Sequence, residues 1–137
     1  MKITIINGPN LNLLGKREPS VYGKETFEDH LSLLKKKYPA VEWVYCQSNI
    51  EGELVTFIQE AEGSTGIILN AGAYTHTSLA IADAIAAITT PVVEVHISNV
   101  FAREGYRHIS FSGSKCVGSI SGLGLKGYEL ALHYFIY

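Results

Sequence analysis

Short apolar runs alternate with helical segments along the whole chain, and this alternation most constrains how the chain can fold. The predicted strands, which are short and rich in β-branched residues, cover residues 2–7, 41–47, 66–70, 91–97 and 115–121. The predicted helices begin near Thr26, at Asn49 and near Thr77, and a last one covers residues 124–136. A shorter helix or loop is expected over residues 102–109. Strands that alternate with helices build a parallel sheet covered on both faces.

Capping residues support the predicted helix starts. Thr26 and Asp29 have the spacing of a capping box, and Pro39 ends the helix that follows them. Asn49 is the expected cap of the second helix, and Thr75 or Thr77 that of the third.

Five strands in this rhythm predict an α/β protein with a flavodoxin-like, doubly wound, five-stranded parallel sheet and helices on both faces. The 137 residues contain no linker, internal repeat or low-complexity tract, so we expect residues 1–137 to form a single domain.

Composition excludes several classes of partner and location. The net charge is −2 and the basic residues form no stripe, which argues against a nucleic-acid surface. Cys46 and Cys116 lie in strand-like runs and are expected to be buried thiols of a reducing compartment. The first ten residues do not resemble a signal peptide, and no apolar stretch is long enough to cross a membrane. We therefore expect a soluble, cytoplasmic protein.

Amide side chains follow three of the predicted strands, at the edge where doubly wound sheets bind ligands. The residues are Asn7 and Asn10 in IINGPN, Asn70 in IILNAG and Asn99 in VEVHISN. Asparagine also favours turns, so any one of them alone carries little weight. Together they predict an edge suited to an uncharged, hydroxyl-rich ligand.

Glu94 and His96 are two residues apart on a predicted strand, so both side chains should project from the same face. A carboxylate beside an imidazole fixes its tautomer and favours its protonated form. The pair could supply a general acid near neutral pH, and the alternative is a hydrogen-bonded core histidine.

Other polar residues near this edge have both a functional and a structural interpretation. His76 precedes the third helix and is either a ligand contact or an ordinary loop residue. Asp83 lies in an apolar helix and should face solvent or an interface. Arg17, Arg103 and Arg107 are the only arginines; each lies in a segment that follows a strand, where a guanidinium group could bind a carboxylate.

The segment GKREPSVYG, residues 15–23, places Lys16 and Arg17 close to Tyr22. Nearby cations favour the phenolate form of a tyrosine, so Tyr22 could act as a base on a lid. The alternative is a solvated turn with an aromatic anchor.

Three further functional interpretations are weaker. GLGLKG, residues 122–127, matches a dinucleotide-binding pattern, but no βαβ unit follows, so close packing of the last helix explains it better. The five histidines lack metal-ligand spacing, and no lysine follows the predicted strands at 66–70 or 91–97, where a Schiff base would be needed. A flavin-binding module would want a hydroxyl-rich phosphate loop, which NGPNLNLL does not provide.

The motifs NGPNLNLLGKREPSVYG, NAGAYTHTS, VEVHISN, AREGYRH and GLGLKGYELAL together resemble the type II 3-dehydroquinate dehydratases over essentially the whole chain. The resemblance implies trans-dehydration of 3-dehydroquinate to 3-dehydroshikimate through an enolate, in the shikimate pathway or in quinate breakdown. It also implies no cofactor, no metal and a homododecamer built as a tetramer of trimers.

The resemblance further implies a role for each matching residue. Tyr22 would be the base, supported by Arg17; Asn10 would help to hold the enolate oxygen through a water; His96, oriented by Glu94, would protonate the leaving hydroxyl. The positions that would bind the substrate's hydroxyl and carboxylate groups are Asn70, His76, Ile97, Ser98 and Arg107. Asp83 would reach the site of a neighbouring subunit.

The chain departs from the family pattern at two places. Gly113 and Ser114 stand where a Ser-Pro pair is expected, and Gly105 stands where an acid is common. Both departures lie beside the motifs, so they affect the expected geometry of local loops and not the expected chemistry.

Overall fold

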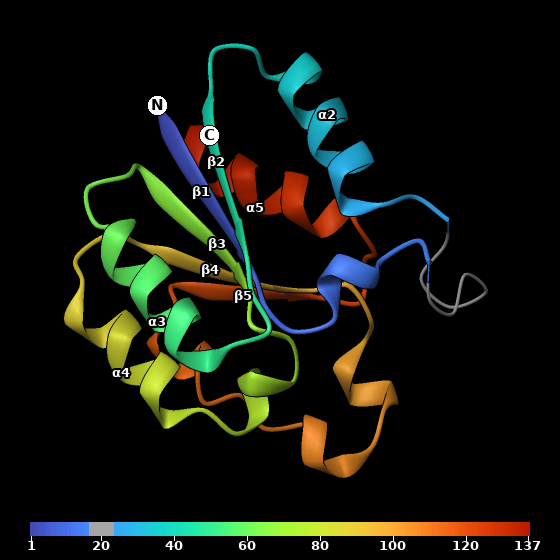
Figure 1. Cartoon of the computed structure of the whole chain (residues 1–137), viewed down its shortest axis with the longest axis vertical. Helices are drawn as coiled ribbons and strands as arrows, with labels where there is room; N and C mark the ends of the chain where they lie inside the picture. The colour runs from blue at the N-terminus through green and yellow to red at the C-terminus, as the bar shows by residue number, and fades with distance from the viewer. Residues whose placement is uncertain (17–23) are drawn as a thin grey trace.

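A five-stranded parallel sheet forms the centre of the molecule in the computed structural model, which describes residues 1–16 and 24–137 (Figure 1). The strands are β1 (Lys2–Asn7), β2 (Glu42–Gln47), β3 (Gly66–Asn70), β4 (Val92–His96) and β5 (Gly118–Ser121). Their order is β2-β1-β3-β4-β5, and every neighbouring pair is parallel. This order confirms the predicted doubly wound, flavodoxin-like sheet and places its switch point between β1 and β3.

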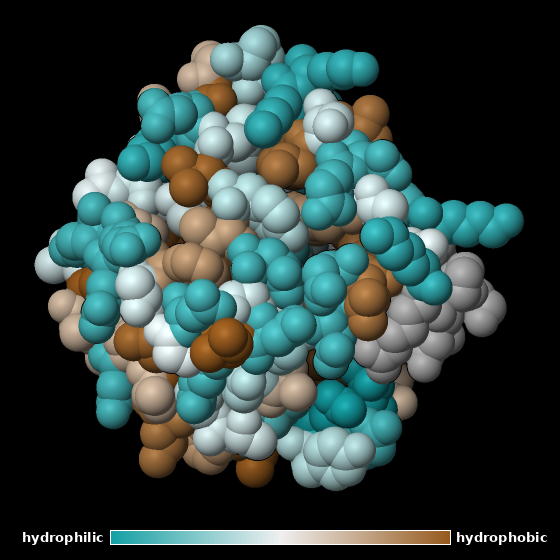
Figure 2. All heavy atoms as spheres, in the orientation of Figure 1, coloured by the Kyte–Doolittle hydropathy of each residue, from teal (hydrophilic) through white to brown (hydrophobic). Residues whose placement is uncertain are grey.

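Helices cover both faces of the sheet, as predicted (Figure 1). They are α2 (Phe27–Lys37), α3 (Glu51–Glu60), α4 (Leu79–Ala87) and α5 (Lys126–Ile136). Helices α2 and α5 pack on one face through residues such as Leu34 and Leu132, and α3 and α4 pack on the other through Ile58 and Ile85. Figure 2 shows mainly hydrophilic residues on the visible face, with apolar residues scattered among them.

Residues of β3 alternate between the two cores, because successive side chains of a strand point to opposite faces. Ile68 packs with α2 and α5, whereas Ile67 and Leu69 pack with α3 and α4. All three side chains are fully buried. Each contributes about 2 kcal/mol through removal of apolar area from water.

The predicted capping box of the first helix is confirmed, but two other predicted caps are wrong. Thr26 accepts a hydrogen bond from the Asp29 amide, and Asp29 accepts one from the Thr26 amide. Helix α3 begins after Ile50, which makes no side-chain cap. Asn49 instead accepts a hydrogen bond from the Asn10 amide, so its side chain links two loops at the sheet edge.

Helix α4 begins later than predicted, after a 3₁₀ turn. Ser78 is its cap, in place of Thr75 or Thr77, and accepts from the Ile81 amide at 2.9 Å. Thr75 belongs to the turn η2 (Gly72–His76) and is fully buried.

The last strand is shorter than predicted, because a 3₁₀ turn, η5 (Gly113–Lys115), occupies its expected start. Cys116 therefore lies outside the sheet. Cys46 and Cys116 are free thiols, half-buried where burial was expected. The close packing predicted for GLGLKG is confirmed, since a Cβ on Gly127 would lie 3.1 Å from Val95 Cγ1. No helix within residues 1–16 and 24–137 combines the length and apolar character needed to span a bilayer.

Candidate active site

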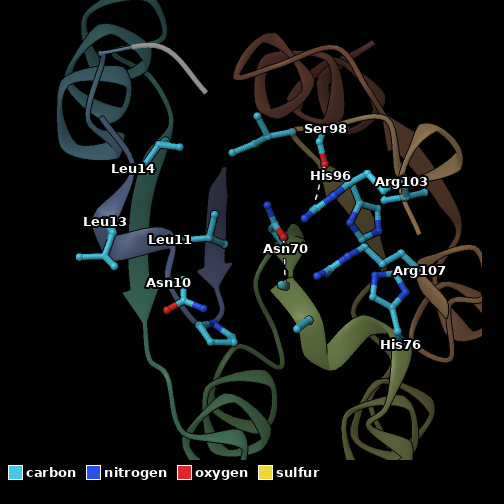
Figure 3. Close-up of a pocket in the computed structure, with 15 residues that line it drawn as sticks. Asn10, Leu11, Leu13, Leu14, Asn70, His76, His96, Ser98, Arg103 and Arg107 are labelled. Carbon is cyan, nitrogen blue, oxygen red and sulfur yellow. Dashed lines mark hydrogen bonds between the residues drawn. The ribbon is translucent and has the colours of Figure 1, made fainter. Parts of the chain in front are cut away.

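A cavity of about 160 Å³ opens at the carboxyl ends of β1, β3 and β4 (Figure 3). Its walls come from residues 9–14, 70–76 and 96–107, which are the segments that follow these three strands. The site thus lies where the sheet order predicts a ligand.

The wall after β1 comes from Pro9, Asn10 and the turn η1 (Leu11–Leu13). Asn10 has a φ of 70°, a left-handed conformation that asparagine tolerates better than most residues. Its backbone N–H donates to Asn49 Oδ1 at 3.0 Å. The apolar residues Leu11, Leu13 and Leu14 also line the cavity, and none of them is among the site residues predicted from the sequence.

The wall after β3 contains the buried amide of Asn70. Its Oδ1 accepts from the Gly72 amide at 3.1 Å, and its Nδ2 donates to the Tyr128 hydroxyl at 3.1 Å. Tyr128 in turn donates to Asn7 Oδ1 at 2.8 Å. Asn7 is fully buried in this network and does not line the cavity, which corrects the expectation that it serves the ligand edge.

Asn99 also departs from the predicted cluster of amides. Its side chain caps the turn η3 (Val100–Ala102) by accepting from the Phe101 amide at 3.1 Å. Of the four candidate amides, Asn10 and Asn70 line the cavity.

Glu94 and His96 project from the same face of β4, as predicted, while Val93 and Val95 enter the apolar core. His96 Nε2 lies 3.2 Å from Glu94 Oε1, and both residues are buried. Burial raises the pKa of the Glu94 carboxyl group, but hydrogen bonds and charge from His96, with hydrogen bonds from Ser110 and Ser119, lower that pKa further, to about 2. Glu94 is therefore an anion that orients the imidazole of His96.

His76 lies against His96 at the cavity wall. The two rings stack with centroids 6.2 Å apart and an interplanar angle of 20°. His76 Nδ1 donates to the Ile109 carbonyl at 2.8 Å, so Nε2 is the nitrogen left for other contacts. The structure thus places two imidazoles side by side at the end of β4.

Two guanidinium groups form the cationic wall, and Figure 3 shows them reaching into the cavity toward the side where Asn70 lies. Arg107 Nε donates to Glu104 Oε2 at 2.6 Å, and Arg103 Nη1 donates to Ser98 Oγ at 3.5 Å. The sequence predicts that both arginines can bind a carboxylate, but only Arg107 is predicted as a site residue. The AREGYRH motif, which carries both, was the signal for Arg103.

The remaining predicted residues divide into three groups. Ile97 and Ser98 line the cavity with the residues above. Asp83 is exposed on α4 and does not line this chain's cavity, which agrees with the prediction that it faces solvent or an interface. Tyr22 and Arg17 lie outside the described residues.

Within the described ranges, no group of three histidine, cysteine or acidic side chains is arranged to hold a metal ion. The polar groups that line the cavity are amides, imidazoles, a hydroxyl and guanidinium groups. They suit hydroxyl and carboxylate groups of a small ligand.

The known proteins that this chain resembles in sequence and in structure belong to one family. The model of the family described as dehydroquinase class II matches residues 1–136. The chain belongs to the class II dehydroquinases. The family's fold agrees: the type II dehydroquinase from Butyrivibrio crossotus superposes with a TM-score of 0.95 at 46% identity, covering 100% of this chain and 98% of that one.

Two curated relatives, each named 3-dehydroquinate dehydratase, are similarly close to this class II dehydroquinase. The protein from Fusobacterium nucleatum is 52% identical over 143 residues, covering 99% of this chain and 97% of the relative. The protein from Halalkalibacterium halodurans is 56% identical over 133 residues, covering 95% of this chain and 92% of the relative.

Proposed function

We propose that this class II dehydroquinase removes water from 3-dehydroquinate to give 3-dehydroshikimate, in the shikimate pathway or in the breakdown of quinate. The observation that carries the proposal is the buried Glu94–His96 pair, whose imidazole lines a cavity that also presents two guanidinium groups. This arrangement provides an acid for a leaving hydroxyl and cations for a substrate carboxylate.

The reaction begins with removal of a proton from the carbon next to the substrate's ketone. The C–H electrons move onto the ketone oxygen and form an enolate, which needs hydrogen-bond donors to stabilise its charge. Asn10, acting through a water, is our candidate for this role. The enolate then collapses, the C–O bond breaks, and His96 gives its proton to the departing hydroxyl, which leaves as water.

The base of the first step is assigned to Tyr22, with Arg17 favouring its phenolate form. Both residues lie outside the described residues, so the sequence pattern alone supports these assignments. The groups that hold the substrate are assigned to Asn70, His76, Ile97, Ser98 and Arg107, all of which line the cavity.

The proposal includes a homododecamer, a tetramer of trimers, in which Asp83 reaches the site of a neighbouring subunit. Asp83 and Leu79 are exposed four residues apart on one face of α4. Phe101, Tyr106 and Ile109 expose 65–68% of their surface on the segments after β4. Exposed apolar side chains of this size favour a protein contact. A cytoplasmic location completes the proposal, since the two free thiols suit a reducing compartment.

The direct test is to incubate the purified protein with 3-dehydroquinate and follow the absorbance of the conjugated enone product. We expect absorbance to rise at a rate proportional to protein concentration, and at least about a hundredfold more slowly with His96→Ala at the same concentration. An active His96→Ala protein would remove the acid from the proposal. A yellow, inactive protein would instead favour a flavin-binding module.

A further inference from the structure

Four hydrogen-bond donors surround the buried carboxylate of Glu94. Oε1 accepts from Ser110 Oγ at 2.6 Å and Ser112 Oγ at 2.8 Å, and lies 3.2 Å from His96 Nε2. Oε2 accepts from Ser119 Oγ at 2.7 Å. A carboxylate can accept about four hydrogen bonds, and Glu94 has four donors beside it, three at Oε1 and one at Oε2.

The three hydroxyls come from two separate parts of the chain. Ser119 lies directly opposite Glu94 in the β4–β5 register, on the same face of the sheet. Ser110 and Ser112 lie between the turn η4 (Gly105–Arg107) and η5. This arrangement requires two elements to dock on β4.

Gly113 makes room for this arrangement. A Cβ at this position would lie 2.6 Å from Glu94 Oε2 and 2.8 Å from Ser110 Oγ, so any larger residue would displace the carboxylate or the hydroxyl. Gly113 is one of the departures from the family pattern, and the adjacent Ser112 supplies a hydroxyl to the same carboxylate. The departure therefore accompanies a donor set centred on Glu94.

The titratable groups that face Glu94 are His96 on β4 and Cys116 between η5 and β5, with His76 stacked behind His96. Burial and the nearby Glu94 charge raise the pKa of the Cys116 thiol to about 12, so this thiol is neutral. No lysine or arginine of the described ranges forms an ion pair with Glu94. Among the described residues, the three hydroxyls and His96 are therefore the groups that stabilise its charge.

We infer that Ser110, Ser112 and Ser119 are positioning residues of the reaction, whose hydroxyls keep Glu94 ionised and fixed so that the proton of the pair stays on His96. A buried carboxyl group without such donors takes up the proton itself. The proton would then sit on Glu94, away from the leaving hydroxyl. The inference rests on the proposed role of His96 as the acid.

The test follows the ¹³C resonance of the labelled Glu94 carboxyl group through a pH titration, without substrate. Ser119→Ala is the main variant, because Ser119 is exposed on the edge strand and its loss should leave the fold intact. Ser112→Ala is a second, buried variant. Ser114→Ala is the matched control, since Ser114 donates to the Phe111 carbonyl and not to Glu94.

We expect the Glu94 carboxyl to titrate at a higher pH, by roughly one unit for each hydroxyl removed. Because Glu94 stays ionised at neutral pH after a one-unit rise, the kcat of Ser119→Ala should fall within the acidic limb of its pH profile, by up to about tenfold, with KM within about twofold. The acidic limb of its kcat profile should move to higher pH with the carboxyl. Ser119→Thr should restore both properties, and Ser114→Ala should match the wild type.

An unchanged Glu94 titration in Ser119→Ala would overturn the inference. A shifted titration with unchanged kcat and pH profile would overturn it too, because the hydroxyls would then serve the fold alone. If the wild type itself fails to dehydrate 3-dehydroquinate, the proposed function fails, whereas a shifted titration would still support the hydroxyls' hold on Glu94.

Discussion

Asn70 at the end of β3 donates from Nδ2 to the hydroxyl of Tyr128 on α5, over 3.1 Å. Tyr128 is fully buried, and its own proton goes to Asn7 Oδ1. The last helix therefore fixes the orientation of an amide that lines the cavity, because the second Asn70 contact, from the Gly72 amide, leaves no freedom to exchange oxygen and nitrogen.

Tyr128→Phe should destabilise the protein by about 2 kcal/mol, because Asn7 and Asn70 each lose a buried hydrogen-bond partner. The KM for 3-dehydroquinate should also rise, since the Asn70 amide loses its fixed orientation. Chemical denaturation and steady-state kinetics measure the two effects. Tyr134→Phe, the same change at an exposed position of α5, is the control and should change neither the stability nor the KM. Wild-type stability in Tyr128→Phe would contradict the argument.

His96→Ala should lower kcat by at least about a hundredfold, the lower range for loss of a general acid. Glu94→Gln should cost less, because glutamine can still accept from His96 but cannot stabilise its charge. Turnover and its pH dependence distinguish the two variants. If Glu94→Gln changes neither, the pair has only a structural role. His133→Ala, on α5 and outside the cavity lining, serves as the control for loss of an imidazole.

Tyr22→Phe should lower turnover by at least about a hundredfold, because it removes the proposed base and keeps the ring. Substrate binding should remain largely intact. Equilibrium binding, measured beside kcat, separates these effects. Near-normal turnover in this variant would exclude Tyr22 as the base.

Glu129 should make the stability of the protein sensitive to acid. Hydrogen bonds from Lys37, Tyr38 and Lys126 lower the pKa of its carboxyl group to about 2. Because this pKa is lower in the folded than in the unfolded chain, the stabilisation is complete above about pH 4.5 and is lost as the pH falls toward 2.

Glu129→Gln should therefore destabilise the protein at pH 7, and its deficit relative to the wild type should shrink as the pH falls from 4.5 to 2. Thermal unfolding of both proteins across this range measures the deficit. Glu51→Gln, at an acid that makes no ion pair with the described residues, is the control. A deficit that stays constant with pH would contradict the assignment.

Asp83→Asn should lower activity without lowering the unfolding midpoint of the subunit, because its proposed partner belongs to a neighbouring chain. Dilution of the wild type should reduce activity in step with dissociation. Size-exclusion chromatography at the assay concentration measures the assembly. A fully active monomer would contradict this prediction.

The sheet and the cavity position followed from local pattern and topology. Isoleucine-rich runs specify buried strands, and the alternation with helices sets which strand ends meet, so Glu94, His96, Asn10 and Asn70 could be placed at one edge. The boundaries of strands and helices were predicted less accurately, because a turn can replace the first residues of either element. The predicted strand start at residue 115 belongs to a 3₁₀ turn, and the cap of α4 is Ser78, which accepts from the Ile81 amide three residues later.

Side chains whose partners lie far along the chain are the ones that local sequence patterns place wrongly. Asn7 follows the same local pattern as Asn10, but Tyr128, 121 residues away, draws it into the core. Asn49 has the residue type and position expected of a helix cap, but its side-chain oxygen accepts a hydrogen bond from the Asn10 amide instead. Spacing along the sequence cannot reveal either contact, because both depend on which elements dock together.

The segments that line the cavity and the residues that support them are made at different times. A ribosome releases the three lining segments before it releases Ser119 on β5 and Tyr128 on α5. Until those two elements dock, Glu94 lacks a hydroxyl donor and Asn70 lacks the phenol that fixes its amide. A chain stalled during translation thus has the walls of the site without its supports, and competence arrives with the final strand and helix.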